Sequence, residues 1–313
     1  MRRRLLALIL GLSMATGCGA RSGTPDTAPG TGPSREASAG VRLAEASKAF
    51  AQLRRLDDAW RDRDCATVER LTTWAERALG GRACEATRNG RPAPARKSYD
   101  DVELYLPGVD EESWFVALAR EPDPAYFLFL REDGEWRLGA GPIPIQGEIH
   151  EPADGAVPAD DPDTGVRARL VPQRYLAYLT DPVGVSGVTF PRGDPVRALF
   201  DELVRRPPNA RPDRLTADVR LLVGPRHALL LPTGGALVIH ALEIEYRQRA
   251  RQGRAALARP IYGRADLRGF TGRTRTAKLT GTEIVLVATE IVGNGSKLVT
   301  TGMRRGLATL TAD

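Results

Sequence analysis

The sequence predicts an α+β protein in which helices pack on curled antiparallel sheets. Helical periodicity followed by short alternating segments and hairpin turns occurs over residues 41–146 and again over 166–313. Between them, residues 147–165 are acidic, rich in proline and poor in core-forming side chains, which is typical of a linker. We therefore expect two tandem α+β units joined by this linker.

Residues 1–17 have the organisation of a signal peptide. Arg2, Arg3 and Arg4 precede an apolar stretch over 5–15, which is too short to span a hydrocarbon core of roughly 30 Å. Small residues then lead directly to Cys18, a pattern that resembles the lipobox of bacterial lipoproteins. The resemblance implies that Cys18 carries acyl chains, such as palmitate, and becomes the first residue of the mature protein. A secretory signal with an incidental cysteine is the alternative.

Residues 18–40 are expected to form the lipidated cysteine and a flexible tether. Gly, Ser, Thr, Pro and Ala dominate them without apolar periodicity, and a chain of this length reaches about 26 Å on average. No later segment approaches the length of a membrane span, so Cys18 is the one membrane attachment that we expect. The predicted location is the extracellular side of the cell membrane.

Two helices open the first unit. Apolar residues in steps of three and four, including Leu53, Leu56 and Trp60, predict a helix over 41–63. Asp64 is placed to cap a second helix over 65–79, which Gly80-Gly81 would end. Strands follow. They are expected at 102–106, 113–120, 125–131 and 135–140, with Asp133-Gly134 as the hairpin turn between the last two.

The second unit repeats this order. A short helix near 175–179 precedes a stronger one over 195–206, which Asp194 caps and Pro207-Pro208 ends. The expected strands are 217–223, 228–231, 237–246, 283–291, 297–301 and 307–311.

Cys65 and Cys84 are the only cysteines besides Cys18. In an oxidising compartment such a pair predicts a disulfide, which closes a loop of about 20 residues and contributes about 3 kcal/mol of stability. Two buried free thiols are the alternative. A metal site is not expected, because two cysteines without a nearby histidine supply too few ligands.

The charge of the chain is unevenly distributed. The full sequence carries 45 basic and 39 acidic residues. Residues 247–278, however, hold ten cations against Asp266 alone. They are Arg247, Arg249, Arg251, Arg254, Arg259, Arg264, Arg268, Arg273, Arg275 and Lys278. This segment is a candidate binding surface for anionic lipid or an acidic wall polymer, or else a solvated loop between strands.

Catalytic motifs are missing from the sequence. It contains no phosphate-binding glycine loop, dinucleotide fingerprint, HExxH or GxSxG. Of the three histidines, His150 lies in the linker, His227 begins a strand, and His240 shares its strand face with apolar residues. We therefore expect His240 to be a hydrogen-bonded core residue. No catalytic residue, cofactor or metal is predicted, and the export signal and modest net charge exclude a nucleic-acid partner.

Aromatic residues concentrate in the first unit. All four tryptophans lie there, at 60, 74, 114 and 136, together with Phe115, Phe127 and Phe129. They form either a filled core or the lining of a ligand cavity inside a curled sheet.

The segment Leu-Arg-Glu-Asp-Gly-Glu-Trp-Arg-Leu over 130–138, which follows the helices, resembles the NTF2-like and cystatin-like folds. With the lipobox, the segment 231–242 and the closing GSKLVTTG, the whole chain is similar to actinobacterial lipoproteins built around domains of unknown function. The resemblance implies a location and not a reaction. Because catalytic motifs are missing, we expect a lipid-anchored, non-catalytic binding or interaction module at the cell envelope, with an envelope protein among its partners. A small-molecule carrier or enzyme that uses an NTF2-like cone is the alternative.

Overall fold

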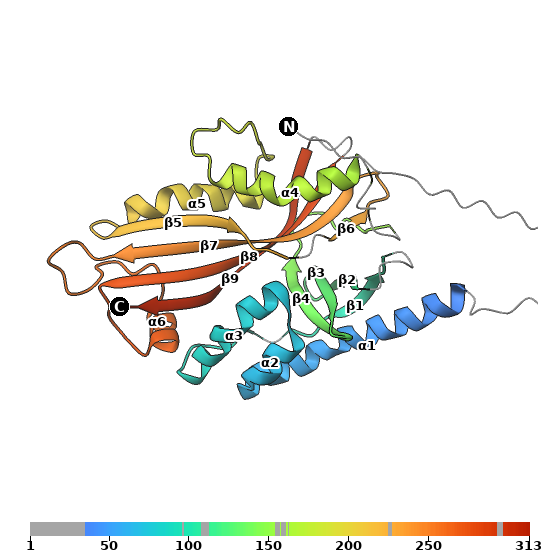
Figure 1. Cartoon of the computed structure of the whole chain (residues 1–313), viewed down its shortest axis with the longest axis horizontal. Coiled ribbons are helices and arrows are strands. Elements are labelled where there is room, and N and C mark those ends of the chain that lie inside the picture. Colours follow the sequence, from blue (N-terminus) through green and yellow to red (C-terminus); the bar gives the residue numbers. More distant parts are fainter. Residues whose placement is uncertain are drawn as a thin grey trace, which may run out of the picture.

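A computed structural model describes residues 35–95, 97–107, 113–153, 157, 161, 163–224, 227–292 and 297–313. The predicted signal peptide, Cys18 and most of the predicted tether lie outside these residues. The described part is an α+β protein with two antiparallel sheets and six helices (Figure 1). The predicted class is therefore confirmed.

The first sheet is a four-stranded antiparallel meander, and three helices precede it in the chain. Its strand order is β1-β2-β3-β4, and Asp133-Gly134 turns between β3 and β4 with positive φ at both residues. The elements are α1 Arg35–Asp62, α2 Cys65–Leu71, α3 Trp74–Arg88, β1 Asp100–Tyr105, β2 Trp114–Glu121, β3 Ala125–Glu132 and β4 Glu135–Pro144. α1 thus begins inside the segment that was expected to be tether.

The second predicted helix is in fact two. Thr72 is extended and bridges Leu138 of β4, which separates α2 from α3. α3 then continues through Gly80-Gly81, so the prediction that these glycines end it was wrong. The reason is packing, because a Cβ on Gly80 would lie 3.0 Å from Val68 Cγ1 of α2. Glycine allows the two helices to approach closely.

The second sheet has the strand order β5-β7-β8-β9, with β6 paired to β7. Its elements are α4 Thr164–Leu179, α5 Pro195–Asn209, β5 Arg214–Leu221, β6 His227–Leu230, β7 Ala236–Arg249, α6 Arg264–Thr271, β8 Lys278–Val292 and β9 Lys297–Ala312. The two last predicted strands form the single long β9, and α6 inside the basic segment was not predicted. Pro207-Pro208 lie within the final turn of α5.

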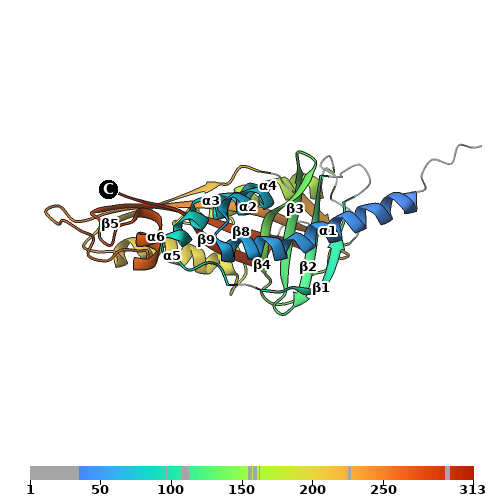
Figure 2. The same cartoon turned by 90° about the horizontal axis from the view of Figure 1, so that it is seen from below.

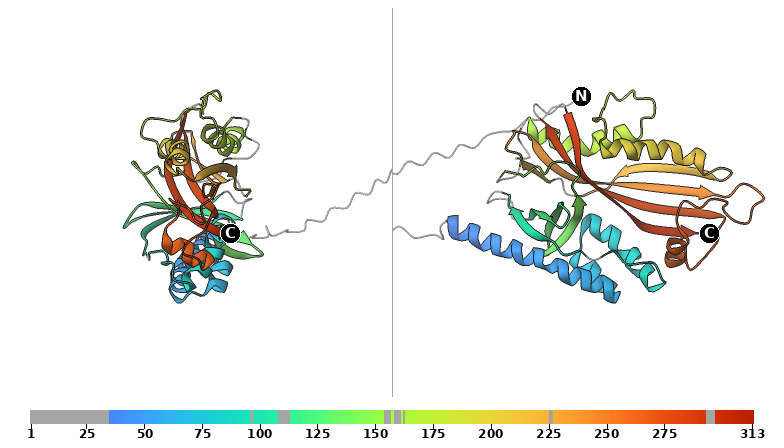
Figure 3. Two further views of the ribbon diagram at one scale, coloured as in Figure 1. Left: turned by 90° about the vertical axis from the view of Figure 1, so that its left-hand side faces the viewer. Right: turned by 180° about the vertical axis from the view of Figure 1, so that it is seen from behind.

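The two sheets share one core. On β7, Val238, Leu242 and Ile244 face the cluster that includes α4 and α5. The alternate residues Leu237 and Ile239 pack in a second cluster with residues of the first sheet. Figures 1 and 3 show α4 and α5 on one side of the long strands, with the first sheet and α1–α3 on the other. Burial on both faces explains why β7 is apolar at consecutive positions, as in 237–239, instead of alternating with polar residues.

Residues 147–165, expected to be a solvated linker, contact the second sheet where they are described. The N–H groups of Ala153 and Val157 donate to the carbonyls of Leu230 and Ala228 of β6. Val157 is buried. Asp161 accepts hydrogen bonds from the N–H groups of residues 163–165 at the start of α4.

None of the described helices combines the length and apolar character that a membrane span requires.

Candidate functional site

A cavity of about 400 Å³ lies where the helices of the first unit meet the last strand of the second. Its walls come from α1, α3, the segment 91–99, β3, β4 and β9. The lining residues are Leu53, Leu56, Asp57, Trp60, Glu76, Leu79, Ala83, Arg91, Pro94, Ala95, Lys97, Tyr99, Asp123, Ala125, Phe127, Leu138, Gly141, Pro142, Pro144, Arg304, Arg305, Gly306 and Leu307. This volume is in the lower range of small-molecule sites.

The cavity walls are mainly apolar. Leu53, Leu56 and Trp60 come from the apolar stripe that predicted α1, and their one-sided spacing directs them together. Phe127 of β3 contacts two further aromatic rings. The ring centroids of Phe50 and Tyr99 lie 5.3 and 4.8 Å from that of Phe127. Trp114, Phe115 and Phe129 are core residues, whereas Trp60 and the buried Phe127 line the cavity.

A buried ion pair stands in this apolar wall. Glu76, in the first turn of α3, pairs with the guanidinium of Arg304 on β9. Its Oε1 also accepts the N–H of Gly141 at 3.0 Å, and Nη1 of Arg304 donates to the carbonyl of Gly141 at 3.2 Å. Both polar groups of the Gly141 residue are therefore satisfied by the pair. The contacts join α3, β4 and β9, which come from both halves of the chain.

Gly141 is required at this junction. Its φ is +139°, and an added Cβ would lie 2.8 Å from Cδ1 of Phe127. Glycine is the residue that adopts such a backbone and allows this approach without strain.

Burial raises the pKa of the Glu76 carboxyl above its usual value, while Arg304 and the Gly141 N–H act in the opposite direction. Desolvation disfavours the charged form of an acid. Desolvation likewise raises the pKa of the half-buried Tyr99.

Most of the other charged groups of the wall are also in ion pairs, and Asp57 contributes a further carboxylate. Lys97 Nζ lies 2.7 Å from Oδ2 of Asp123, and Nε of Arg91 lies 2.9 Å from Oδ1 of Asp266 on α6. Arg305 turns to the opposite face of β9, where it binds Glu202 and Glu283. The cavity consequently offers a mainly apolar surface in which most of the neighbouring charges are paired with one another.

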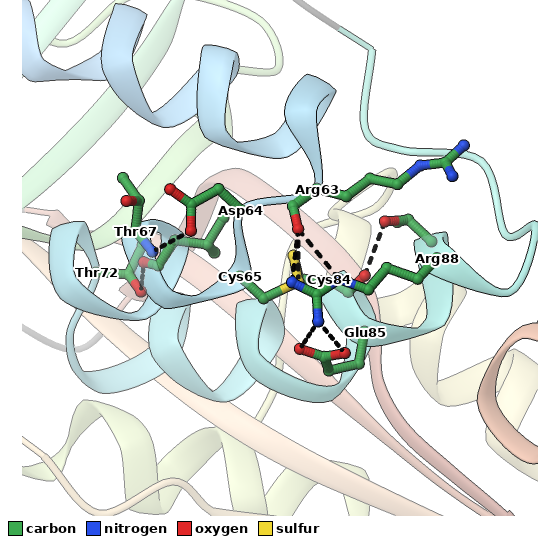
Figure 4. The surroundings of a disulfide bond; sticks show 10 residues. Arg63, Asp64, Cys65, Thr67, Thr72, Cys84, Glu85 and Arg88 are labelled. Carbon is green, nitrogen blue, oxygen red and sulfur yellow. Dashed lines mark hydrogen bonds and ion pairs between the residues drawn. A yellow bond between two sulfur atoms is a disulfide. The ribbon is translucent and has the colours of Figure 1, made fainter.

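The predicted disulfide is confirmed and supports this site. Cys65 at the start of α2 is bonded to Cys84 in α3, one residue after Ala83 of the cavity wall (Figure 4). Beside it, Arg88 donates from Nε and Nη2 to the carbonyl of Arg63, which follows α1, at 3.2 and 2.9 Å. The bond and this contact hold α3 against the end of α1.

All ten cations of the predicted basic segment are exposed. Arg247 and Arg249 end β7, Lys278 begins β8, Arg264 and Arg268 lie on α6, and the remaining five lie in the loops that join these elements. Within the described part of the chain, Arg247 is the cation of this segment that forms an ion pair, and its partner is the carboxylate of Glu245. The segment lies at the end of the long sheet and lines no part of the cavity.

The histidines also lie outside the cavity. His240 is buried, as predicted, with Nε2 3.1 Å from Oγ1 of Thr289, and burial lowers its pKa to about 3. His227 stacks on Trp114 of the first sheet, and burial lowers its pKa to about 4. His150 Nδ1 lies 3.3 Å from Oε2 of Glu290. Within the described ranges, no group of three or more His, Cys, Asp or Glu side chains is placed to hold a metal ion.

Sequence reasoning missed Glu76 and Arg304. The available signal was weak: Glu76 is one of several charged residues in the helix predicted over 65–79, and Arg304 lies between the strands predicted over 297–301 and 307–311. No protein-family model, curated protein or solved structure matches the chain.

Proposed function

We propose that this protein is an exported, lipid-anchored cell-envelope protein whose body binds a small, mainly apolar and uncharged ligand without chemical conversion. The proposal that the body binds a ligand rests on the cavity of about 400 Å³ between α1, α3, β4 and β9. Apolar walls with few polar groups are the usual make-up of a small-molecule site.

The pairing of the charges favours binding over catalysis. Glu76 is engaged by Arg304 and the Gly141 N–H, and Lys97 is engaged by Asp123. A general acid or base needs access to a reacting atom, and none of the three histidines lines the cavity. The paired charges also make a charged ligand less favourable than a neutral one, since it would add an unpaired charge to a mainly apolar space.

The location is supported by the order of basic residues, apolar stretch, small residues and Cys18. The repeated order of helices and antiparallel strands supports an origin in two NTF2-like or cystatin-like units, which here share one core. An enzyme using an NTF2-like cone is the second candidate, and the engaged Glu76 argues against it.

The anchor is tested by changing Cys18 to Ala in the producing cell. We expect the protein to disappear from the membrane fraction or to remain unprocessed at this position. Normal cleavage before residue 18 with unchanged recovery in membranes would exclude lipidation at Cys18.

The cavity is tested with the neutral apolar fluorophore N-phenyl-1-naphthylamine. We expect saturable one-to-one binding by the unmutated chain and loss of binding in Ala83→Phe, because the new ring projects from a buried lining position. Arg82→Phe is the matched control, because it adds the same ring one residue away on the exposed side of α3. Thermal unfolding checks that Ala83→Phe folds. If a folded Ala83→Phe binds as tightly as the unmutated chain, or if the unmutated chain shows no saturable binding, the cavity is not a ligand site.

A further inference from the structure

Three cations stand side by side across the far end of the second sheet. Arg214 of β5 is directly opposite Arg249 of β7, which is directly opposite Lys278 of β8. Directly opposite residues of an antiparallel sheet point to the same face, and neighbouring strands are about 4.8 Å apart. Arg214, in the second unit but outside the basic segment, is brought into this row by strand register alone.

These cations are not neutralised. Among the described residues, no carboxylate lies within ion-pairing distance of any of the three, and all three are exposed. Asp313 lies next to Lys278 through a backbone hydrogen bond of 3.3 Å, but it forms no ion pair with it. Further along the same face, by contrast, Arg220 pairs with Asp218 at 2.6 Å.

Like charges directly opposite one another destabilise a sheet. Elsewhere on this sheet, cations have carboxylates beside them: Arg220 pairs with Asp218, and Arg247 pairs with Glu245. The register also places Asp313 opposite Lys278, so the row holds three cations and one carboxylate side chain, and its remaining positive charge favours an anionic partner.

Loop residues enlarge this row. Arg251 and Arg254 follow β7, Arg273 and Arg275 precede β8, and all four are exposed. Together with Arg214, Arg249 and Lys278 they form what we call the basic tip. Its charges are spread over a face and its adjoining loops, so several would engage a chain of charges at once.

The basic tip lies at the opposite end of the molecule from the start of α1. Figures 1, 2 and 3 place the first turns of α1 at one end of the long axis and the α6 end of the second sheet at the other. β8 alone has 15 residues and spans about 50 Å. The Debye length is about 8 Å at physiological salt, so headgroups near the start of α1 exert little attraction on the tip when the long axis points away from the membrane.

We propose that the basic tip binds an acidic polysaccharide of the cell envelope, with the membrane-attached end of the protein directed away from it. The envelope location rests on the proposed function, whereas the charge complementarity does not. A bilayer surface is the competing partner, and the position of the tip makes it the weaker one.

The test uses the mature chain from residue 19 onward, so that neither an acyl chain nor the basic and apolar residues of the predicted signal peptide contribute. Binding to polygalacturonate, to neutral dextran and to vesicles of phosphatidylglycerol and phosphatidylcholine is measured at low and high salt. The tip variant is Arg214→Ser with Arg249→Ser and Lys278→Ser. The control removes the same charge from exposed positions of α1 and α3, as Arg54→Ser, Arg55→Ser and Arg82→Ser.

We expect polygalacturonate binding that weakens steeply with salt, and a loss of about tenfold or more in the tip variant against less than about twofold in the control. Equal losses in both variants, or no binding of the unmutated tip at low salt, would overturn the proposal. Stronger binding to the anionic vesicles than to the polysaccharide would also overturn it, and would assign the tip to a membrane. Fluorophore binding in the cavity is measured on the same variants, so failure of the tip is separated from failure of the ligand site.

Discussion

Replacing Arg304 with methionine should destabilise the protein strongly, because it leaves Glu76 buried without its counter-ion. The side chain of Glu76 is only 11 % exposed and that of Arg304 is 25 % exposed. Removing one partner of a buried pair costs about 3–5 kcal/mol. The Gly141 N–H stays with the carboxylate, so we expect a loss near 3 kcal/mol, or about 6–10 °C in melting temperature.

This loss should depend on pH in a defined direction. Burial already raises the pKa of Glu76, and removing Arg304 takes away an influence that lowers it. The folded state then binds this proton more tightly than the unfolded state does. Stability therefore rises as pH falls through the folded pKa, and the cost is greatest at higher pH, where Glu76 must be buried as an anion.

Urea unfolding at pH 7.5 and pH 5.0 measures both effects on the full chain. Arg304→Met should lose more stability at pH 7.5 than at pH 5.0. Adding Glu76→Gln should recover part of the loss, because a neutral amide still accepts from Gly141. The exposed Arg54→Met should change stability by less than about 0.5 kcal/mol. Equal losses at both pH values, together with no recovery in the double variant, would refute the buried-pair reasoning.

Two further outcomes are expected. Changing Cys65 and Cys84 together to Ser should lower the free energy of unfolding by about 3 kcal/mol, and alkylation of both thiols in the unreduced native protein would rule the bond out. His240 has a folded pKa of about 3 against about 6.5 when unfolded, so the folded state loses stability as pH falls below the unfolded value. His240→Gln should therefore remove about 2 kcal/mol of the acid-dependent loss between pH 7 and pH 4.5, and an unchanged acid slope of urea-unfolding stability would contradict the burial of a neutral ring.

Local patterns in the sequence were sufficient for most of the elements. The stripe over Leu53, Leu56 and Trp60 predicted α1, and Asp133-Gly134 predicted the β3–β4 turn, because both depend on neighbours in the chain. The same reasoning failed at Gly80-Gly81. There the glycine serves a contact between two helices, which local propensity does not describe.

Local sequence patterns could not predict the candidate site. Glu76 and Arg304 are separated by 228 positions, and neither carries a motif. The basic tip could be predicted only in part from the sequence. Counting charges along the chain identified Arg249 and Lys278 but not Arg214. Strand register placed Arg214 beside them, and a slip of one residue would turn it to the other face.

The sequence by itself determined the α+β class, the disulfide pair and the uneven charge, because spacing and composition act over short stretches of chain. Only the tertiary structure decided that the two sheets share a core, that a cavity opens between α1, α3 and β9, and that the basic tip lies at the end opposite the start of α1. These features depend on which faces are buried against each other, and burial is settled only when the whole chain packs.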